Sequence, residues 1–140
     1  MSPFSIVLRT LRARFSLGQG EFAARLGYRQ TYISALECGT KLPKDEELVQ
    51  KIVSALDLGQ GDETALRRAY NISKRFEFPP HGVAAEAYAL CFELSEALPA
   101  LSSEEINTMR VVLDSVRRAS MAAAISRNAP MSRALKEIPM

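Results

Sequence analysis

The sequence predicts an all-α protein. Nineteen alanines and sixteen leucines stand against nineteen valines, isoleucines and threonines taken together, so residues that favour helices outnumber those that favour strands. Apolar residues also recur at intervals of three and four positions, which is the spacing along one face of a helix. With 47% hydrophobic and 24% charged residues, the composition is that of an ordinary globular protein with a buried core.

Five short helices are predicted in residues 1–78. Gly27 and Gly39 suit left-handed caps at the ends of the second and third helices. Pro43 and the acids at positions 45 to 47 mark the start of the fourth, because acids complement the positive end of the helix macrodipole. Asp62 is a candidate N-cap for the fifth. The apolar stripes comprise Phe4, Val7, Leu8, Leu11 and Phe15; then Phe22, Ala23 and Leu26; then Thr31 or Tyr32 with Ile33 and Leu36; then Leu48, Ile52, Ala55 and Leu56; and finally Leu66, Ala69, Tyr70, Ser73 and Phe76.

Two longer helices are predicted in residues 83–127, after a linker at residues 79–82 that begins with two prolines. Their apolar residues are spaced alternately three and four apart, which is the pattern of a coiled-coil seam. Ser102 and Glu105 form a capping box at the start of the second helix. The two helices should therefore fold back as an antiparallel hairpin. Residues 128–140 are predicted to be a flexible tail.

The positive charge is concentrated near the N-terminus. Residues 1–44 carry seven lysines and arginines against two glutamates, a net charge of +5, whereas the rest of the chain is slightly acidic. Such an excess suits a polyanionic partner and is the electrostatic footprint of a nucleic-acid-binding surface, although a modest one.

Residues 19–38 have the pattern of two short helices that cross closely. Gly27 tolerates the positive φ of a tight turn. The small side chain of Ala23 lets the second helix approach, and Ile33 and Leu36 fill the angle between the helices. This pattern predicts a helix-turn-helix motif, in which the helix that begins at Gln30 is exposed and can enter the major groove of DNA. A plain helical hairpin that uses Gly27 as a C-cap is the alternative interpretation.

Because of these residues, the segment 4–58 resembles the Xre family of helix-turn-helix domains, which is the group of the lambda repressor and Cro. The similarity is carried by the string LGQGEFAARLGYRQTYISALECGTKLP at residues 17–43. The resemblance implies a five-helix, lambda-repressor-like DNA-binding domain that acts as a dimer on a palindromic operator. Gly18, Arg29 and Ala35 depart from the family pattern, which bears on base specificity rather than on the fold. The residues in family-typical positions are Gln19, Phe22, Ala23, Leu26, Gly27, Tyr32, Ile33, Ser34, Leu36, Glu37, Gly39 and Pro43.

The resemblance also implies which residues contact DNA. Gln30 and Thr31 should face base edges. A Gln amide can pair with adenine and a Thr methyl group can rest on thymine, so some A·T content is predicted in each half-site. Ser34 and Ala35 lie one turn further along the same face, where Ala35 offers only an apolar contact. The predicted phosphate contacts are Gln19, Arg29, Thr40, Lys41 and Lys44, followed less strongly by Arg12 and Arg14.

Several of these residues have a second interpretation. Arg29 can reach a phosphate or a guanine, and its place at the edge of the helix favours the phosphate. Glu37 is expected to pair with an arginine such as Arg12, because a carboxylate beside a phosphate would be repelled. Tyr32 and Phe22 are interpreted as core residues, and the two cysteines as small apolar fillers.

The hairpin at residues 83–127 needs a partner surface, because two amphipathic helices cannot cover their own apolar seam. The partner is either the N-terminal domain or the same hairpin of a second subunit, and the linker and the two-fold symmetry of the family's operators favour the second subunit. A ligand or another protein is a further alternative. The predicted dimer interface consists of Cys91, Leu94, Leu98, Ile106, Met109, Leu113 and Val116.

No enzymatic activity is expected. His81 is the single histidine, and no nucleophile with an adjacent base and no phosphate-binding loop is present. Cys38 and Cys91 lie far apart and suggest neither a zinc site nor a disulfide framework. No catalytic residue, metal or cofactor is therefore predicted. The apolar stretches are far shorter than the roughly 20 residues of a membrane span, so a cytoplasmic protein without a membrane partner is expected.

Together these features predict a sequence-specific DNA-binding transcriptional regulator, a repressor that acts as a homodimer on a palindromic operator of double-stranded DNA. The alternative is an antitoxin-type interaction module, in which the hairpin at residues 83–127 binds a partner protein while the N-terminal domain regulates its own operon. Co-purification of a second polypeptide would favour this alternative.

Overall fold

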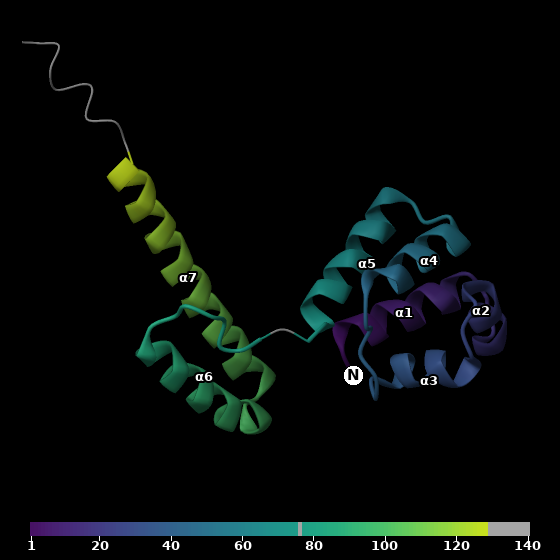
Figure 1. Ribbon diagram of the computed structural model, residues 1–140, viewed down its shortest axis with the longest axis horizontal. Coiled ribbons are helices and arrows are strands. Elements are labelled where there is room, and N and C mark those ends of the chain that lie inside the picture. Colours follow the sequence, from purple (N-terminus) through teal and green to yellow (C-terminus); the bar gives the residue numbers. More distant parts are fainter. Residues whose placement is uncertain (76, 129–140) are drawn as a thin grey trace, which may run out of the picture. The chain divides into compact units, whose positions relative to one another are not determined.

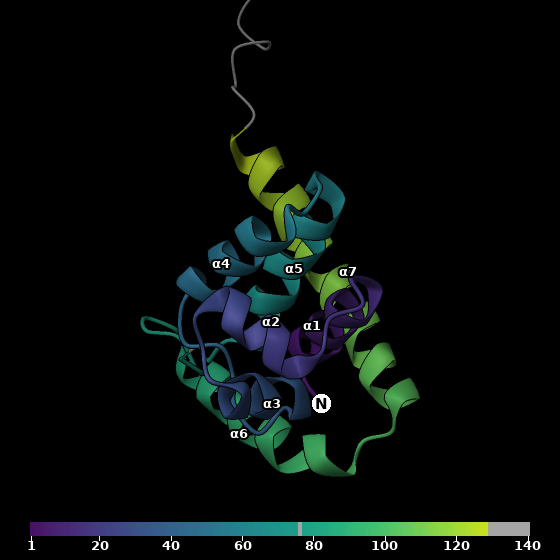
Figure 2. The same ribbon diagram turned by 90° about the vertical axis from the view of Figure 1, so that its right-hand side faces the viewer.

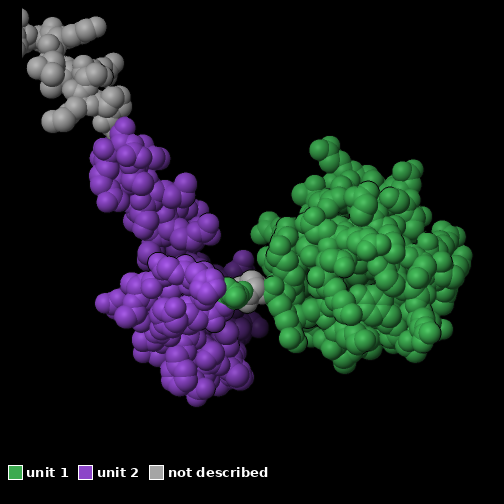
Figure 3. All heavy atoms as spheres, viewed as in Figure 1, with its two compact units in different colours: residues 1–77 green, residues 78–140 purple. Residues whose placement is uncertain are grey.

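The structure, a computed structural model, describes residues 1–75 and 77–128, and these residues form helices and no strand, as predicted (Figure 1). The chain divides into two compact units, residues 1–77 and 78–140 (Figure 3). The predicted linker at residues 79–82 lies at the start of the second unit. The helices are α1 (Pro3–Arg14), α2 (Gln19–Leu26), α3 (Gln30–Cys38), α4 (Glu46–Leu56), α5 (Gln60–Ser73), α6 (Ala85–Ala97), the 3-10 helix η1 (Leu98–Ala100) and α7 (Ser103–Asn128).

Helix α1 is the central element of the first unit, because it packs against both α3 and α5 (Figures 1 and 2). Its N-terminus is capped by Ser2, whose hydroxyl accepts a hydrogen bond from the backbone N–H of Ser5 at 3.2 Å. The buried N–H of Phe4 donates to the hydroxyl of Ser73 on α5 at 3.0 Å. This bond links the first and last helices of the unit and fixes the end of α5 against α1.

The apolar stripes of the five helices meet in one core, as the helical spacing predicts. The buried apolar residues are Phe4, Leu8, Leu11, Leu17, Phe22, Ala23, Leu26, Ile33, Leu36, Leu48, Val49, Ile52, Leu56, Leu66 and Tyr70.

Three expectations about the first unit need correction. Phe15 lies at the C-cap of α1 and is exposed, and Leu17, three positions after α1 ends, takes the place in the core. Asp62 does not cap α5, because α5 begins at Gln60, so Asp62 lies within its first turn. Tyr32 is only half-buried and packs against the edge of the core. Phe76 lies outside the described residues.

The turn between α2 and α3 has the predicted geometry. Gly27 adopts a left-handed φ of 74° at the end of α2, and Gly39 adopts a φ of 77° at the end of α3. Side chains rarely adopt this conformation without strain, so glycine suits both positions. Ala23, Ile33 and Leu36 are buried between the helices. The turn thus holds α3 against the unit by one face and leaves its other face exposed.

Glu37 holds α3 in place through a nearly buried ion pair with Arg12 of α1. The guanidinium donates from Nε to Oε1 at 2.6 Å and from Nη2 to Oε2 at 3.1 Å, while its Nη1 donates to the carbonyl of Leu17 at 3.0 Å. Gln19 at the start of α2 donates to Glu37 Oε2 at 3.0 Å. The hydrogen bond that Arg12 donates to Glu37 raises the pKa of Arg12. One carboxylate therefore ties α1, α2 and α3 together, which confirms the expected pairing of Glu37 with Arg12.

In the second unit, α6 and α7 are joined by η1 and run in roughly opposite directions in both views (Figures 1 and 2). The predicted capping box is present: the N–H of Ser102 donates to Glu105 Oε2 at 2.7 Å, and the N–H of Glu105 donates to the hydroxyl of Ser102 at 3.3 Å. These hydrogen bonds lower the pKa of Glu105.

No residue of α6 or α7 is buried. Cys91, Leu94 and Ile106 are half-buried within their unit. The other predicted interface residues, which are exposed, are Leu98, Met109, Leu113 and Val116. The expected tail lies outside the described residues from residue 129 onward. Among the described helices, none combines the length and the hydropathy that a membrane crossing requires.

Removing one partner of the ion pair between Arg12 and Glu37 should destabilise the first unit. Glu37→Gln leaves the Arg12 charge partly buried and unpaired, so the free energy of unfolding should fall by about 3 kcal/mol. Urea unfolding followed by circular dichroism measures the change. The control Glu21→Gln removes an exposed pair with Arg25 at 3.0 Å, which should cost less than about 0.5 kcal/mol. Equal losses in the two variants would show that the pair does not hold α3.

Candidate nucleic-acid interface

The outer face of α3 carries the residues predicted to contact bases. Gln30 and Thr31 are exposed at the start of the helix, and Ser34 and Ala35 are half-buried one turn further along. The opposite face is fixed in the core and by the ion pair of Glu37. The structure therefore brings all four predicted base-contacting residues to one accessible side of the first unit.

Gln30 lies against the start of α2 rather than extending freely. A Cβ atom built on Gly20 would lie 3.3 Å from Gln30 Oε1, so any larger residue at position 20 would crowd the amide. Gly20 thus leaves the space in which the Gln30 side chain rests.

The seven cations of residues 1–44 divide into two groups. Arg12 pairs with Glu37, Arg14 pairs with Asp62 at 2.6 Å, and Arg25 pairs with Glu21 at 3.0 Å. A fourth, Arg9, donates to the sulfur of Met1 at 3.3 Å. Like Arg9, the cations Arg29, Lys41 and Lys44 have no carboxylate partner within the described part of the chain, and these last three flank α3 in the sequence.

This division changes the expected phosphate contacts. Arg12 and Arg14 are used in ion pairs within the unit, so the structure does not present them as free cations. Gln19 lies at the start of α2 as predicted, but one N–H of its amide is held by Glu37. Its remaining N–H and the first backbone N–H groups of α2, which has no side-chain cap, are the donors left for an anion.

The loop after α3 folds back onto the end of the helix. The hydroxyl of Thr40 and the backbone N–H of Lys41 both donate to the carbonyl of Ala35, each at 3.1 Å. These bonds satisfy a carbonyl at the helix C-terminus. The Thr40 hydroxyl can donate to a phosphate only if it leaves Ala35, whereas the Lys41 ammonium group is free of hydrogen bonds within the described residues.

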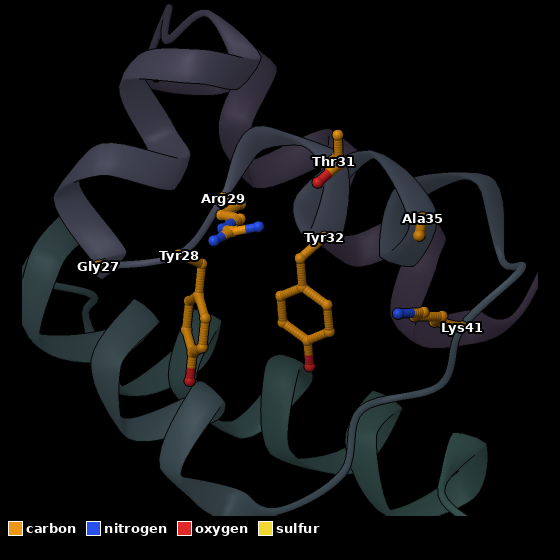
Figure 4. A pocket seen from close by; sticks show the side chains of 7 residues that line it. All are labelled: Gly27, Tyr28, Arg29, Thr31, Tyr32, Ala35 and Lys41. Carbon is orange, nitrogen blue, oxygen red and sulfur yellow. The ribbon is translucent and has the colours of Figure 1, made fainter.

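A shallow groove of about 450 Å³ runs beside α3 (Figure 4). It extends from the turn before the helix to the loop after it, with Arg29 near one end and Lys41 near the other. No acidic residue lines it. Its lining residues are Gly27, Tyr28, Arg29, Thr31, Tyr32, Ala35 and Lys41.

Two tyrosines form a wall of this groove. The sequence pattern did not predict that either of them lies at the surface. The rings of Tyr28 and Tyr32 lie 5.1 Å apart between centroids and are tilted by 46°. Lys51 lies over the ring of Tyr28 at 4.6 Å, and Lys41 lies over the ring of Tyr32 at 5.8 Å. Burial raises the pKa of the Tyr32 hydroxyl above its ordinary value.

A second depression lies on the other side of the two tyrosines and differs in charge. It is lined by Lys44 and Lys51 but also by Asp45 and Glu47. Asp45 caps α4 by accepting the N–H of Glu47 at 3.1 Å, and Glu47 pairs with Lys51 at 3.1 Å. The mixed charges suit an anion less well than the groove beside α3. Within the described residues, no group of three His, Cys, Asp or Glu side chains is placed to hold a metal ion.

Comparison with known protein families agrees with this geometry. Residues 3–66 match the family model described as a helix-turn-helix domain. No curated protein and no solved structure shows significant similarity to the chain. The matched segment contains α1 to α4 and the first half of α5, and it includes the turn at Gly27 and the exposed face of α3. Residues 3–66 therefore have both the sequence pattern and the geometry of a helix-turn-helix domain.

Proposed function

We propose that the protein is a sequence-specific transcriptional regulator that represses by occupying its operator as a homodimer. The observation that carries this proposal is the exposed face of α3, on which two side chains able to read bases lie between cations that have no carboxylate partner in the described residues. Repression by occupancy requires no chemistry, and no catalytic role is proposed for any residue.

Base reading is assigned to the start of α3. The Gln30 amide can donate to and accept from adenine at the same time, and the methyl group of Thr31 can rest on the methyl group of thymine. Ser34 can bond to either kind of base edge, and Ala35 adds an apolar contact. Half-sites with A·T pairs opposite the start of α3 fit these side chains.

Affinity for the DNA backbone is assigned to the three cations that flank α3 and have no carboxylate partner in the described residues. Arg29, Lys41 and Lys44 precede and follow α3, so they can reach the phosphates that flank it when it enters the major groove. Gln19 and the uncapped N-terminus of α2 add neutral donors, which suit a phosphate at the positive end of a helix. Thr40 contributes after its hydroxyl leaves Ala35.

Dimerisation is assigned to α6 and α7. Leu113 and Val116 of α7 are 59% and 57% exposed, although the sequence predicts that they belong to a coiled-coil seam. Contiguous apolar residues of this kind are rare on the surface of a monomer and mark an interaction site. A second copy of the chain would cover the seam and present two copies of α3, as a palindromic operator requires.

Base reading by Gln30 can be tested with Gln30→Ala. This variant should lose about 1 to 3 kcal/mol of binding free energy on the cognate operator and little on random DNA, because it removes a contact with a base edge. Operators selected from random oligonucleotides supply the duplex for a gel-shift titration. Gln60→Ala, at the start of α5, is the matched control and should bind like the wild type. Equal losses on both duplexes would exclude Gln30 from base reading.

Phosphate binding by Lys41 should appear in the salt dependence. Lys41→Ala should weaken binding to every duplex and reduce the slope of log affinity against log salt by about one, because one fewer counterion is released. Arg68→Ala, an exposed cation on α5, should leave the slope unchanged. The phosphate role would be refuted by a Lys41→Ala slope identical to that of the wild type.

The dimer can be tested by deleting residues 79–140. The remaining unit keeps its whole core, so it should stay folded, but it should sediment as a monomer, whereas the full chain sediments as a dimer. The shortened protein should also bind a full operator with the affinity of a single half-site. A shortened protein that still sediments as a dimer would place the interface in the first unit.

A further inference from the structure

The groove beside α3 contains an aromatic wall that base reading and phosphate binding leave unused. Its polar ends are Arg29 and Lys41, and its interior is formed by the rings of Tyr28 and Tyr32 and by Ala35 (Figure 4). The absence of acidic side chains from its lining distinguishes it from the depression on the other side of the tyrosines, where Asp45 and Glu47 lie. An extended ligand with an apolar middle and negative charges at both sides fits this arrangement.

The dimensions of DNA indicate what that ligand is. A helix with its side chains is about 10 to 12 Å wide, and the major groove is about 12 Å wide. When α3 lies in the major groove, the two sugar-phosphate strands must therefore pass along its two sides. The groove lies along one of these sides, from the turn before α3 to the loop after it. With nine residues, α3 is about 14 Å long, which is enough to follow about two nucleotides of a strand.

We propose that this groove holds the backbone of one DNA strand, with Tyr32 packed against a deoxyribose between two phosphates bound by Arg29 and Lys41. The inference rests on the proposed function and adds to it a contact that is neither a base nor a phosphate. The sugar supplies the apolar middle, and the two phosphates supply the charges.

The contacts of the tyrosines assign different roles to them. The Tyr28 ring is covered by the ammonium group of Lys51 at 4.6 Å and lies beside Tyr32 at 5.1 Å. It acts as a positioning residue that fixes the Tyr32 ring. Tyr32 also lies beneath Lys41 at 5.8 Å, and the ring attracts this ammonium group toward the groove. Tyr32 thus contacts the sugar and holds a phosphate-binding cation near it.

The salt dependence of the binding affinity distinguishes an uncharged contact from a phosphate contact. Tyr32→Ala should weaken binding to all duplexes about tenfold, while the slope of log affinity against log salt stays close to that of the wild type. Hydroxyl radicals cleave DNA at the deoxyribose, so footprinting should show one protected sugar per half-site that Tyr32→Ala exposes. Tyr32→Phe keeps the ring and should keep both the affinity and the protection.

Val53→Ala is the matched control for lost packing, because Val53 is also half-buried against the core but does not line the groove. It should reduce stability and leave the footprint unchanged. A measurement on the wild-type chain avoids any folding defect of Tyr32→Ala: operator duplex should slow nitration of Tyr32 by tetranitromethane and should not slow nitration of Tyr88, which is 54% exposed on α6.

The outcomes separate this inference from the proposed function. If the wild type binds no duplex, the proposed function itself fails. If the wild type binds its operator but Tyr32→Ala keeps full affinity and the sugar stays protected, the operator role stands and the groove does not hold a strand. Nitration of Tyr32 at the same rate with and without operator would overturn the inference in the same way.

Discussion

The position of α3 depends on one carboxylate. Glu37 lies on the buried side of the helix and accepts hydrogen bonds from Arg12 of α1 and Gln19 of α2, so three helices converge on two oxygen atoms. Burial of Ile33 and Leu36 sets which face of α3 points into the core, but hydrophobic packing by itself is not directional. The two-pronged ion pair is directional, because a guanidinium and a carboxylate bind in one plane. The ion pair therefore fixes which side chains of α3 face outward. The candidate nucleic-acid interface consists of these outward-facing side chains.

Much of this arrangement could be predicted from the sequence, because it depends on local rules. Gly27 and Gly39 end α2 and α3 as the preference of glycine for left-handed caps requires, and the capping box at Ser102 follows from two residues three positions apart. The pairing of Glu37 with an arginine such as Arg12 could be inferred from charge, since a carboxylate beside a phosphate would be repelled. The caps and the capping box depend on residues a few positions apart in the sequence. The pairing of Glu37 depends only on the sign of the charges involved.

Other features escaped prediction because they depend on distant parts of the chain. Arg14 pairs with Asp62, which lies four helices later, and this contact explains both why Arg14 is not a free cation and why Asp62 is not a cap. Tyr32 satisfies the helical pattern of a core residue, but its ring lies at the edge of the core beside Tyr28. Periodicity shows which side of a helix faces inward. It does not show how far the neighbouring elements extend to cover that side.

The net charge of residues 1–44 therefore overstates what the interface offers to DNA. Of the seven cations, three are neutralised by carboxylates within the unit, and the three that flank α3 have no such partner in the described residues. Paired cations stabilise the fold and contribute little to counterion release, whereas unpaired cations supply the salt-dependent part of the affinity. Gln30 and Thr31 are uncharged, so the base discrimination proposed for them should persist at salt concentrations that weaken the phosphate contacts. In the proposed function, ion pairs orient α3, cations without a carboxylate partner bind the phosphates of the duplex, and neutral side chains select its sequence.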